Sequence, residues 1–454
     1  MPESADVVVV GAGIAGAALT YHLAVRRGVS RVILVDEREP LTLTSDKGTQ
    51  AYRNWWPGPD ATMLRYMTRS IDILEEIAEE SGNGFRMNRR GYVFVTADEE
   101  GVDRLRATAR EVSAFGMGDL REQSAKAAEY APAPLEGFRG QPTGADLLPG
   151  EAARRVFPGL AKDVQAALHV RRAGWLHGVS LGTWMLKRAA AARVSFVHDR
   201  VTAIDHAAGR VRGVRLASGA TIGTERVAIA AGPALPDVAR MLDLELPLFH
   251  ELHAKLTLRD TRGAISRALP FLIWNDPVVL QWNDAERVKM MHDEEVLRLL
   301  APFPGGVHVR PVDGPYGDEL YIIWTYDIEP REFVWPPRFD PHYGEAAIRG
   351  AARMLPAIAA YFGAGSQGFV DGGYYCKTRE NRPLVGPLPV EGAYVLGALS
   401  GFGIMGAHGG ADLLAAHLTG GRLPDYATWF LPSRYDDASY CADVEQWGAQ
   451  AGQL

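Results

Sequence analysis

The first residues that could do chemistry are three glycines with the spacing of a dinucleotide-binding turn. Gly11, Gly13 and Gly16 follow the apolar run 7–10. Gly11 permits the sharp turn, Gly13 lets the main chain approach a pyrophosphate, and Gly16 allows a helix to pack closely on the strand. The start of that helix presents unpaired N–H groups and the positive end of its dipole to phosphates. The stretch therefore predicts a strand, a phosphate-binding turn and a helix.

An acidic residue follows at the distance that the same motif requires. Asp36 ends a second apolar run, 32–36, and stands twenty residues after Gly16. At the end of a strand its carboxylate is placed to accept hydrogen bonds from a ribose diol. The strand, turn, helix and acid together indicate a dinucleotide.

A second glycine-rich turn lies near the C-terminus. The run 393–397 is typical of a strand, the turn 400–405 contains Gly401 and Gly403, and a helix is expected from there to about 418. The start of this helix also suits a negatively charged group. Two such helix starts at opposite ends of one chain favour a ligand that spans both, and FAD fits better than a mononucleotide.

The middle of the chain supplies further strands and an aromatic region. A strand expected at 227–232 ends in Ala231 and Gly232, where backbone can approach a cofactor closely. From 247 to about 337, aromatic and β-branched residues with charges between them indicate a mostly antiparallel sheet over a ligand. The fold class is therefore α/β, with a Rossmann-like FAD-binding domain interleaved with an α+β substrate domain built on a mostly antiparallel sheet. We expect the FAD-binding domain to comprise 1–84, 151–240 and 341–454, and the substrate-binding domain to comprise 85–150 and 241–340.

Composition argues against several classes of protein. The 454 residues are 47% hydrophobic and carry a formal net charge of −7, so no basic surface for nucleic acid is expected. Cys376 and Cys441 are too few for a disulfide framework or a cysteine metal site, which favours a reducing cytoplasm. His250 and His253 would lie on opposite faces of a strand, so no metal site is predicted. We see no targeting segment and no integral membrane segment, and expect a soluble protein.

With these residues in view, the chain resembles the D-amino-acid oxidase/glycine oxidase/sarcosine oxidase superfamily of FAD-dependent oxidoreductases. The likeness covers nearly the whole length, in the order that members of the superfamily show. It rests on the fingerprint ending at Asp36, the Thr-Ser loop after it, Gly174-Trp175, the Ala-Ala-Gly strand, and the segment 378–386 followed by 400–403. Many flavoproteins share the N-terminal fingerprint, whereas the C-terminal pair of segments is considerably more specific.

The resemblance implies which residues hold FAD. The glycine turn and Asp36 would bind the ADP part, Val201 would lie near the adenine, and the loop from Thr44 would follow the flavin and its phosphates. The turn from Gly401 would face the pyrimidine end of the isoalloxazine, where the helix dipole stabilises negative charge on reduction. The expected FAD contacts are Gly11, Gly13, Ile14, Ala15, Gly16, Asp36, Glu37, Thr44, Ser45, Lys47, Gly48, Thr49, Val201, Ala231, Gly232, Gly401, Phe402, Gly403, Ile404 and Met405.

Comparison with monomeric sarcosine oxidases implies the substrate site. Arg53 falls at the arginine that pairs with the substrate carboxylate, and a guanidinium fork matches a carboxylate. Met405 stands where those oxidases carry a carboxylate-binding lysine, which argues against a small N-methyl amino acid. Lys289 roughly matches the lysine that activates oxygen, with His292 as a polar substrate contact; the alternative is that Lys289 is a solvated lysine on a strand. Gly373 occupies the position of the cysteine that links flavin covalently, so we expect non-covalent FAD.

The expected activity is FAD-dependent oxidation of a C–N bond of an amine or amino acid, with hydride transfer to flavin N5 and hydrolysis of the imine. Electrons would pass to oxygen, a quinone or another electron-transfer acceptor. The alternative is a 2-hydroxy-acid dehydrogenase on the same fold, in which Arg53 still holds a carboxylate. A flavin monooxygenase is disfavoured because no second Gly-Asp pyrophosphate motif is present, and a flavin-binding protein without turnover stays open.

Overall fold

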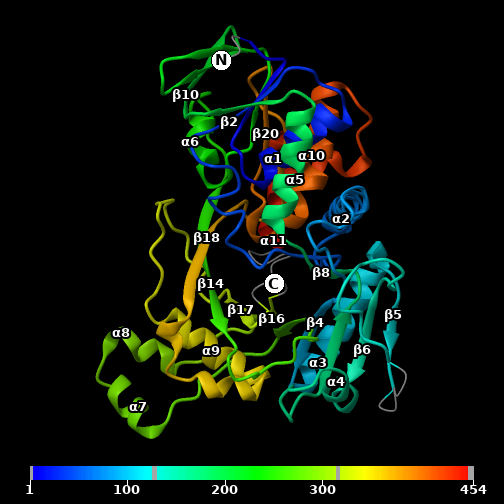
Figure 1. The fold of residues 1–454 in the computed structure, drawn as a ribbon, viewed down its shortest axis with the longest axis vertical. Coiled ribbons are helices and arrows are strands. Elements are labelled where there is room, and N and C mark those ends of the chain that lie inside the picture. The colour runs from blue at the N-terminus through cyan, green and yellow to red at the C-terminus, as the bar shows by residue number, and fades with distance from the viewer. Residues whose placement is uncertain (1–3, 125–129, 313–316, 448–454) are drawn as a thin grey trace.

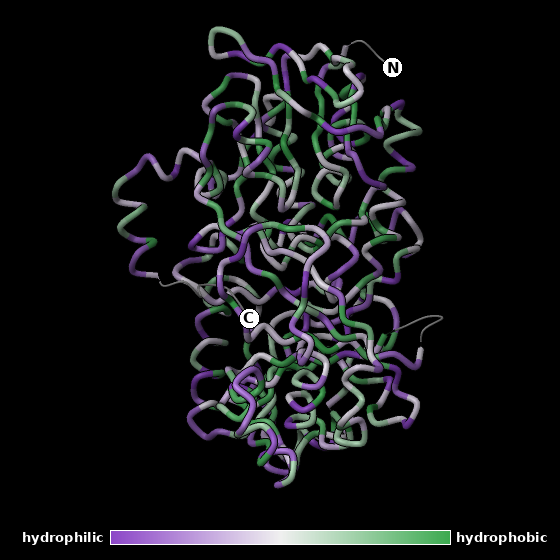
Figure 2. Tube along the Cα trace, turned by 90° about the vertical axis from the view of Figure 1, so that its left-hand side faces the viewer, coloured by the Kyte–Doolittle hydropathy of each residue, from purple (hydrophilic) through white to green (hydrophobic). Residues whose placement is uncertain are grey.

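Two large sheets dominate the computed structural model, which describes residues 4–124, 130–312 and 317–447. A six-stranded sheet lies in the upper part of Figure 1 and a nine-stranded sheet in the lower part, and helices pack against both. The apolar stretches run through the interior of both parts, while hydrophilic stretches lie mainly at the periphery (Figure 2). Within the described part of the chain, every helix is too short or too polar to serve as a membrane span.

The six-stranded sheet is parallel except at one edge, where β19 and β20 run antiparallel. Its strands, in spatial order, are β19 (Leu384–Pro387), β20 (Ala393–Gly397), β13 (Val227–Ile229), β1 (Val7–Val10), β2 (Val32–Asp36) and β9 (Ser195–His198). Successive side chains of a strand point to opposite faces, so Val7 and Val9 pack against helices while Val8 and Val10 pack toward a small antiparallel sheet. That small sheet consists of β10 (Val201–Ala207), β11 (Arg210–Leu216) and β12 (Thr221–Gly223).

The nine-stranded sheet is mixed, with six antiparallel and two parallel pairings. Its strands, in spatial order, are β18 (Phe369–Lys377), β14 (Phe249–Arg259), β17 (Glu319–Trp324), β16 (Val307–Pro311), β15 (Phe271–Trp274), β4 (Tyr92–Thr96), β7 (Ala166–Val170), β6 (Ala145–Pro149) and β5 (Leu120–Glu122). The long strands β14 and β18 lie side by side and rise toward the six-stranded sheet (Figure 1). The two sheets are therefore joined along one edge of the molecule.

The remaining elements are a two-stranded ribbon and the helices. The ribbon pairs β3 (Ala51–Arg53) with β8 (Ala173–Trp175). The α-helices are α1 (Ile14–Tyr21), α2 (Thr62–Glu80), α3 (Glu99–Val112), α4 (Gly150–Val156), α5 (Gly178–Ala191), α6 (Leu235–Arg240), α7 (Asp284–Met290), α8 (Glu294–Leu297), α9 (Tyr343–Met354), α10 (Gly403–Thr419) and α11 (Ala438–Trp447).

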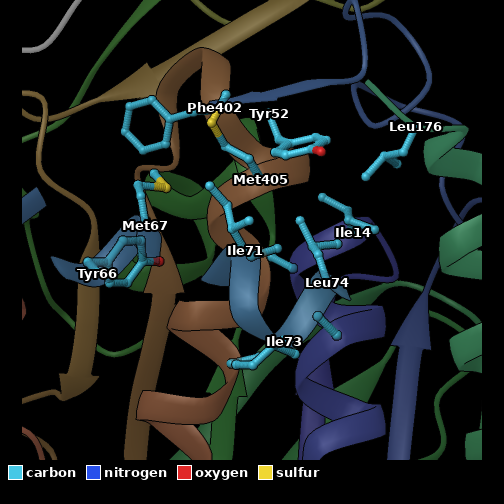
Figure 3. Close-up of a cluster of buried hydrophobic side chains, with 14 of the residues drawn as sticks. Ile14, Tyr52, Tyr66, Met67, Ile71, Ile73, Leu74, Leu176, Phe402 and Met405 are labelled. Atoms are coloured by element: carbon cyan, nitrogen blue, oxygen red, sulfur yellow. The ribbon is translucent and has the colours of Figure 1, made fainter. Parts of the chain in front are cut away.

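Helix α2 fixes the starts of α1 and α10. Its side chains Met67 and Ile71 pack beside Phe402 and Met405, and Ile14 lies close by in the same cluster (Figure 3). Polar contacts add to this packing on α10. The Ser70 hydroxyl donates to the Met405 carbonyl and accepts from the Gly409 N–H at 2.8 Å, and the Tyr66 hydroxyl donates to the Gly406 carbonyl at 2.7 Å. The two helix starts are thereby held in a fixed relation.

Sheet membership differs from the expected domain boundaries in two places. Strand β7 was expected in the FAD-binding segment 151–240, but it pairs with β4 and β6 in the nine-stranded sheet. Helix α9 and strand β18 were expected in the segment 341–454, but β18 is the edge of the nine-stranded sheet and α9 packs on that sheet's core. The reason is that strand pairing, which composition does not report, decides which sheet a segment joins. By sheet membership, 85–170 and 249–377 surround the nine-stranded sheet.

A buried ion pair fastens the C-terminal segment to the turn that precedes β19. Arg434 donates to Glu380 Oε1 at 2.7 Å and to the backbone carbonyls of Pro383 and Arg382 at 3.0 and 3.1 Å. The hydroxyls of Tyr435 and Tyr440 donate to the same carboxylate oxygen at 2.7 and 3.0 Å. Because Glu380 and Arg434 are almost fully buried, each charge depends on the other.

Replacement of Arg434 by Met should therefore destabilise the fold strongly. It leaves the Glu380 carboxylate buried without its cation, a change that costs about 3–5 kcal/mol in comparable pairs. Unfolding in urea, followed by far-UV circular dichroism, measures the change. The matched control is Arg139→Met, which removes an exposed ion pair with Glu79 and should leave the unfolding midpoint nearly unchanged. Equal midpoints for the two variants would contradict this account of the C-terminal segment.

Candidate active site

Two cavities meet at the starts of α1 and α10. The larger, of about 520 Å³, extends between the glycine turn, the end of β2 and the start of β10. The smaller, of about 150 Å³, lies between the start of α10, the loop 44–50 and the nine-stranded sheet. Both cavities are lined by Ile14, Thr44, Ser45, Tyr374, Ser400 and Gly403. An elongated ligand with two bulky ends fits this arrangement.

The glycine turn brings backbone segments into close contact at Gly11 and at Gly16. Gly11 has a φ of +103°, and a Cβ there would lie 2.5 Å from the Ala230 carbonyl oxygen. A Cβ on Gly16 would lie 1.8 Å from the Gly11 carbonyl oxygen, so α1 can pack on the turn only with glycine at this position. The resulting turn exposes main chain rather than side chains to the larger cavity.

Asp36 ends β2 at the rim of the larger cavity and organises the backbone around it. Its Oδ2 accepts a hydrogen bond from the Ala12 N–H at 2.6 Å, and its Oδ1 accepts one from the Arg38 N–H at 2.8 Å. A carboxylate has about four acceptor positions, so both oxygens can still accept from a ligand. Val201, at the start of β10, lines the same cavity.

The loop before α10 holds two non-glycine residues in a strained conformation. Ala398 and Ser400 have φ values of +53° and +48°, in the left-handed region. Both line the larger cavity, and Gly401 beyond them leaves room for the Tyr375 ring, which a Cβ would meet at 2.3 Å. Such strain at a cavity wall is typical of a binding loop.

Arg53 enters the smaller cavity as a buried cation. Its side chain is 8% exposed, and its guanidinium carbon lies 4.6 Å from the centre of the Trp56 ring and 5.8 Å from that of Tyr92. No carboxylate of the described residues forms an ion pair with Arg53, and its Nε has no hydrogen-bond partner there. Burial raises the pKa of Tyr92 to about 12, so this phenol stays neutral beside the guanidinium. The site therefore holds a positive charge that suits an anionic ligand.

Two neutral histidines also line the smaller cavity. His308 contacts the Gly306 carbonyl through Nδ1 at 2.5 Å, and burial lowers the pKa of His308 to about 4. His253 contacts the Glu251 carboxylate through Nε2 at 2.8 Å, and its ring stacks on Tyr375 with the centres 3.9 Å apart. Burial lowers the pKa of His253 as well, against the opposing effect of Glu251.

A lysine of β14 lines the same cavity. Lys255 forms an ion pair with Asp371 of the neighbouring strand β18 at 3.1 Å, and its ammonium lies 4.5 Å from the centre of the Tyr321 ring. Burial lowers the pKa of Lys255 and raises the pKa of Asp371. The Lys255 ammonium and the Asp371 carboxylate therefore largely neutralise each other in the cavity wall.

The structure gathers nearly all of the expected site residues around the two cavities. The exception among the expected cofactor contacts is Gly16, which lies beneath the glycine turn. The larger cavity is lined by Gly11, Gly13, Ile14, Ala15, Asp36, Glu37, Thr44, Ser45, Val201, Ala231, Gly232 and Gly403. The smaller cavity is lined by Ile14, Thr44, Ser45, Lys47, Gly48, Thr49, Arg53, Gly373, Gly401, Phe402, Gly403, Ile404 and Met405.

Lys289 and His292 are corrections to the expected substrate site. The expected strand around them is helix α7 and the turn after it, at an outer corner of the molecule (Figure 1). Both side chains are exposed and line neither cavity. The physical cause is a capping box, in which Asn283 and Glu286 bind each other's backbone N–H groups and start the helix.

The sequence reasoning missed His253, Lys255 and His308 as cavity residues. The signal was present in the strand pattern. In β14 the polar residues 251, 253 and 255 alternate with apolar residues, and in β16 His308 stands between two valines. Period-two alternation places such residues on one face of a sheet. Within 4–124, 130–312 and 317–447, no group of three or more His, Cys, Asp or Glu side chains is suited to a metal ion.

Comparison with curated proteins finds two mitochondrial sarcosine dehydrogenases as relatives. Human mitochondrial sarcosine dehydrogenase is 24% identical over 98% of this chain, and the mouse protein of the same name is 23% identical over the same share. The alignment covers 42% of each of these proteins, so the chain spans less than half the length of the curated relatives that it matches.

Comparison with solved structures finds the same fold. The L-proline dehydrogenase from P. horikoshii matches with a TM-score of 0.74 and 19% identity, over 96% of this chain and 99% of that one. Glycine oxidase from Geobacillus kaustophilus matches with a TM-score of 0.69 and 17% identity, over 94% and 98% of the two chains. Both matches support the α/β fold class.

A family model matches the part of the chain that contains the glycine turn, Asp36 and the C-terminal turn, and it confirms the resemblance drawn from the sequence. The model described as DAO, FAD dependent oxidoreductase, matches residues 6–417. This range contains both cavities and the elements that form them. The chain thus belongs to the DAO family of FAD dependent oxidoreductases.

Proposed function

We propose that the chain oxidises the C–N bond of an amino acid whose carboxylate binds to Arg53. The observation that carries this proposal is the buried guanidinium at the smaller cavity, which has no carboxylate partner among the described residues. An ionised ligand oxygen would supply the missing counter-charge, and an arginine fork matches a carboxylate in a two-bond geometry. The proposal agrees with the activities of similar proteins, which include a sarcosine dehydrogenase, an L-proline dehydrogenase, a glycine oxidase and an iminodiacetate oxidase.

The residues around the two cavities fit FAD. Main-chain atoms of the glycine turn and the carboxylate of Asp36 would hold the ADP part in the larger cavity. The loop from Thr44 to Thr49 and the start of α10 would hold the flavin part near the smaller cavity. Bound FAD supplies the acceptor for a hydride. Gly373 offers no side chain for a covalent link, and burial raises the pKa of the Cys376 thiol to about 12, which supports non-covalent FAD.

The residues of the smaller cavity would bind and orient the substrate and exclude water. Arg53 fixes the carboxylate end, and the neutral hydroxyls of Tyr92 and Tyr375 can donate hydrogen bonds, since burial raises the pKa of each to about 12. Phe271 and Ile323 complete an apolar wall. A site that excludes water and holds the substrate in one orientation aligns a C–H bond for hydride loss. No strong acid or base needs to act at that carbon.

The proposal also concerns the electron acceptor and a second class of substrate. The electrons would pass to oxygen or to a quinone or other electron-transfer acceptor. A 2-hydroxy acid also carries a carboxylate for Arg53, so oxidation of such an acid is the second candidate function. Lys289 and His292 take no part in either proposal, because both are exposed on the outer corner formed by α7.

Anaerobic titration of the purified flavoprotein tests the proposed function. Sarcosine, glycine, L-proline and iminodiacetate are compared with L-lactate and glycolate, and flavin absorbance near 450 nm is followed. We expect at least one amino acid to bleach the flavin, because hydride loss from the substrate reduces it. Pyrrolidine, which is proline without its carboxylate, should bleach the flavin much more slowly at equal concentration than L-proline does. Bleaching by hydroxy acids alone would establish the second candidate function instead.

Replacement of Asp36 by Ala should weaken the binding of FAD. The change removes ligand hydrogen bonds to a charged group, worth about 1.5–3 kcal/mol, and also frees the Ala12 N–H that Asp36 holds. We expect the dissociation constant of FAD, measured by fluorescence titration of apoprotein, to rise at least about tenfold. The matched control is Asp205→Ala on β10, which removes an exposed ion pair with Arg215 of β11. An unchanged dissociation constant of FAD for Asp36→Ala would contradict the assignment.

A further inference from the structure

Three buried ionisable side chains form a chain that ends at the smaller cavity. Lys377 of β18 donates to Glu251 Oε1 at 2.8 Å, and His253 of β14 contacts Glu251 Oε2 through Nε2 at 2.8 Å. The three side chains are 1%, 5% and 2% exposed. His253 alone of the three lines the cavity.

The carboxylate fixes which ring nitrogen of His253 carries the proton. Hydrogen bonds from His253 and Lys377 hold the pKa of Glu251 below its usual value against the effect of burial, so Glu251 is ionised and can only accept. Nε2 of the neutral ring therefore carries the proton, and Nδ1 presents a lone pair. Among the described residues no hydrogen bond to Nδ1 is found.

The surroundings of His253 suit a ring that gains one proton. Its pKa is lowered mainly by burial, which keeps the ring neutral at pH 7, and Glu251 opposes that effect. The other groups that face the ring are Lys377 and Tyr375 on β18 and Asp327 after β17. A carboxylate bound to the far side of an imidazole stabilises the imidazolium that forms on protonation.

We propose that Nδ1 of His253 takes the proton that a substrate ammonium group must lose before its C–N bond is oxidised. This inference rests on the proposed function. The N–H bond of the substrate breaks, the proton bonds to Nδ1, and the electron pair stays on the substrate nitrogen. That pair then forms the C=N bond as the α-carbon loses its hydride, for which FAD, held by the glycine turn and the start of α10, would supply the acceptor. Glu251 and Lys377 are positioning residues, which fix the tautomer and the orientation of the ring.

His308 is the competing proton acceptor in the same cavity. Its Nδ1 contacts a carbonyl oxygen, which can only accept, so its Nε2 also presents a lone pair. His308 has no carboxylate partner among the described residues, and besides burial the charge of Arg53 lowers its pKa. Protonated His308 would lie beside that cation, whereas protonated His253 would lie against an anion. The geometry therefore favours His253.

Stopped-flow reduction of the flavin under anaerobic conditions tests the inference. The probe is L-proline or sarcosine, whichever reduces the wild-type flavin faster, at pH 7 and near pH 10. For His253→Gln, whose amide can still donate to Glu251, we expect the rate at pH 7 to fall about 10²-fold, the contribution of a general base. Near pH 10 a large fraction of an alkyl ammonium group, with a pKa of about 10.4, arrives already neutral, so most of that loss should disappear.

A second variant and two controls separate catalysis from structure. The double change Glu251→Leu with Lys377→Met removes the ion pair without leaving either charge buried alone. At pH 7 its rate of flavin reduction should fall less than that of His253→Gln, by about tenfold or more. Near pH 10 most of that loss of rate should likewise disappear. His250 lies on the opposite face of β14, and His250→Gln keeps a donor for the Pro233 carbonyl. The flavin of this control variant should be reduced at the wild-type rate. Circular dichroism and FAD content establish that each variant is folded.

The outcomes distinguish this inference from the function on which it rests. Equal loss of rate for His253→Gln at both pH values, or no loss, would overturn the role of His253 while amines still reduce the wild-type flavin. A loss that recovers near pH 10 in His308→Gln but not in His253→Gln would assign the proton to His308. A wild-type flavin that no amino acid reduces at any pH would overturn the proposed function and this assignment with it.

Discussion

A guanidinium buried among aromatic rings is the constraint on which the account of the site depends. Burial of an unpaired cation costs several kcal/mol, and in Arg53 the Trp56 ring and neighbouring polar groups offset only part of that cost. The cavity in front of Arg53 is consequently a place where an anion gains binding energy. The same cavity adjoins the larger one at the starts of α1 and α10. Under the proposed function, this arrangement would bring an anionic substrate and the reactive end of FAD together.

Local sequence patterns predicted the two glycine-rich turns and the acid beside the larger cavity. The requirement for glycine at Gly11 and Gly16 is a matter of backbone approach within one turn, and the structure shows carbonyl oxygens where a side chain would stand. The position of Asp36 follows from the combined length of the first strand, the helix and the second strand. The start of α10 at Gly403 was likewise visible as a strand, a turn and a helix. Each of these features is set by neighbours in the sequence, so its geometry could be inferred without tertiary contacts.

The lining of the smaller cavity was harder to predict because distant strands build it. Lys289 was assigned from an approximate match of sequence, although the capping box from Asn283 to Glu286 indicates a helix that faces solvent. His253 and His308 face the cavity because β14 and β16 are separated only by β17 in one sheet, and no local pattern reports that order. The pairing of β14 with β18 also brings Lys377 to a carboxylate 126 residues away. The alternation of residues within a strand predicted which side chains share a face of the sheet. It did not predict which strands pair with each other.

The central claim is that the Arg53 guanidinium and the flavin of bound FAD share the smaller cavity. A non-oxidisable carboxylate, pyrrole-2-carboxylate, tests it through the visible absorption spectrum of the bound flavin. The account predicts a saturable difference spectrum with the wild-type protein, and a dissociation constant at least about tenfold higher for Arg53→Met because a charged hydrogen-bond partner is lost. Pyrrole itself, without the carboxylate, should give no difference between the two proteins. An identical dissociation constant for pyrrole-2-carboxylate in both proteins would contradict the account.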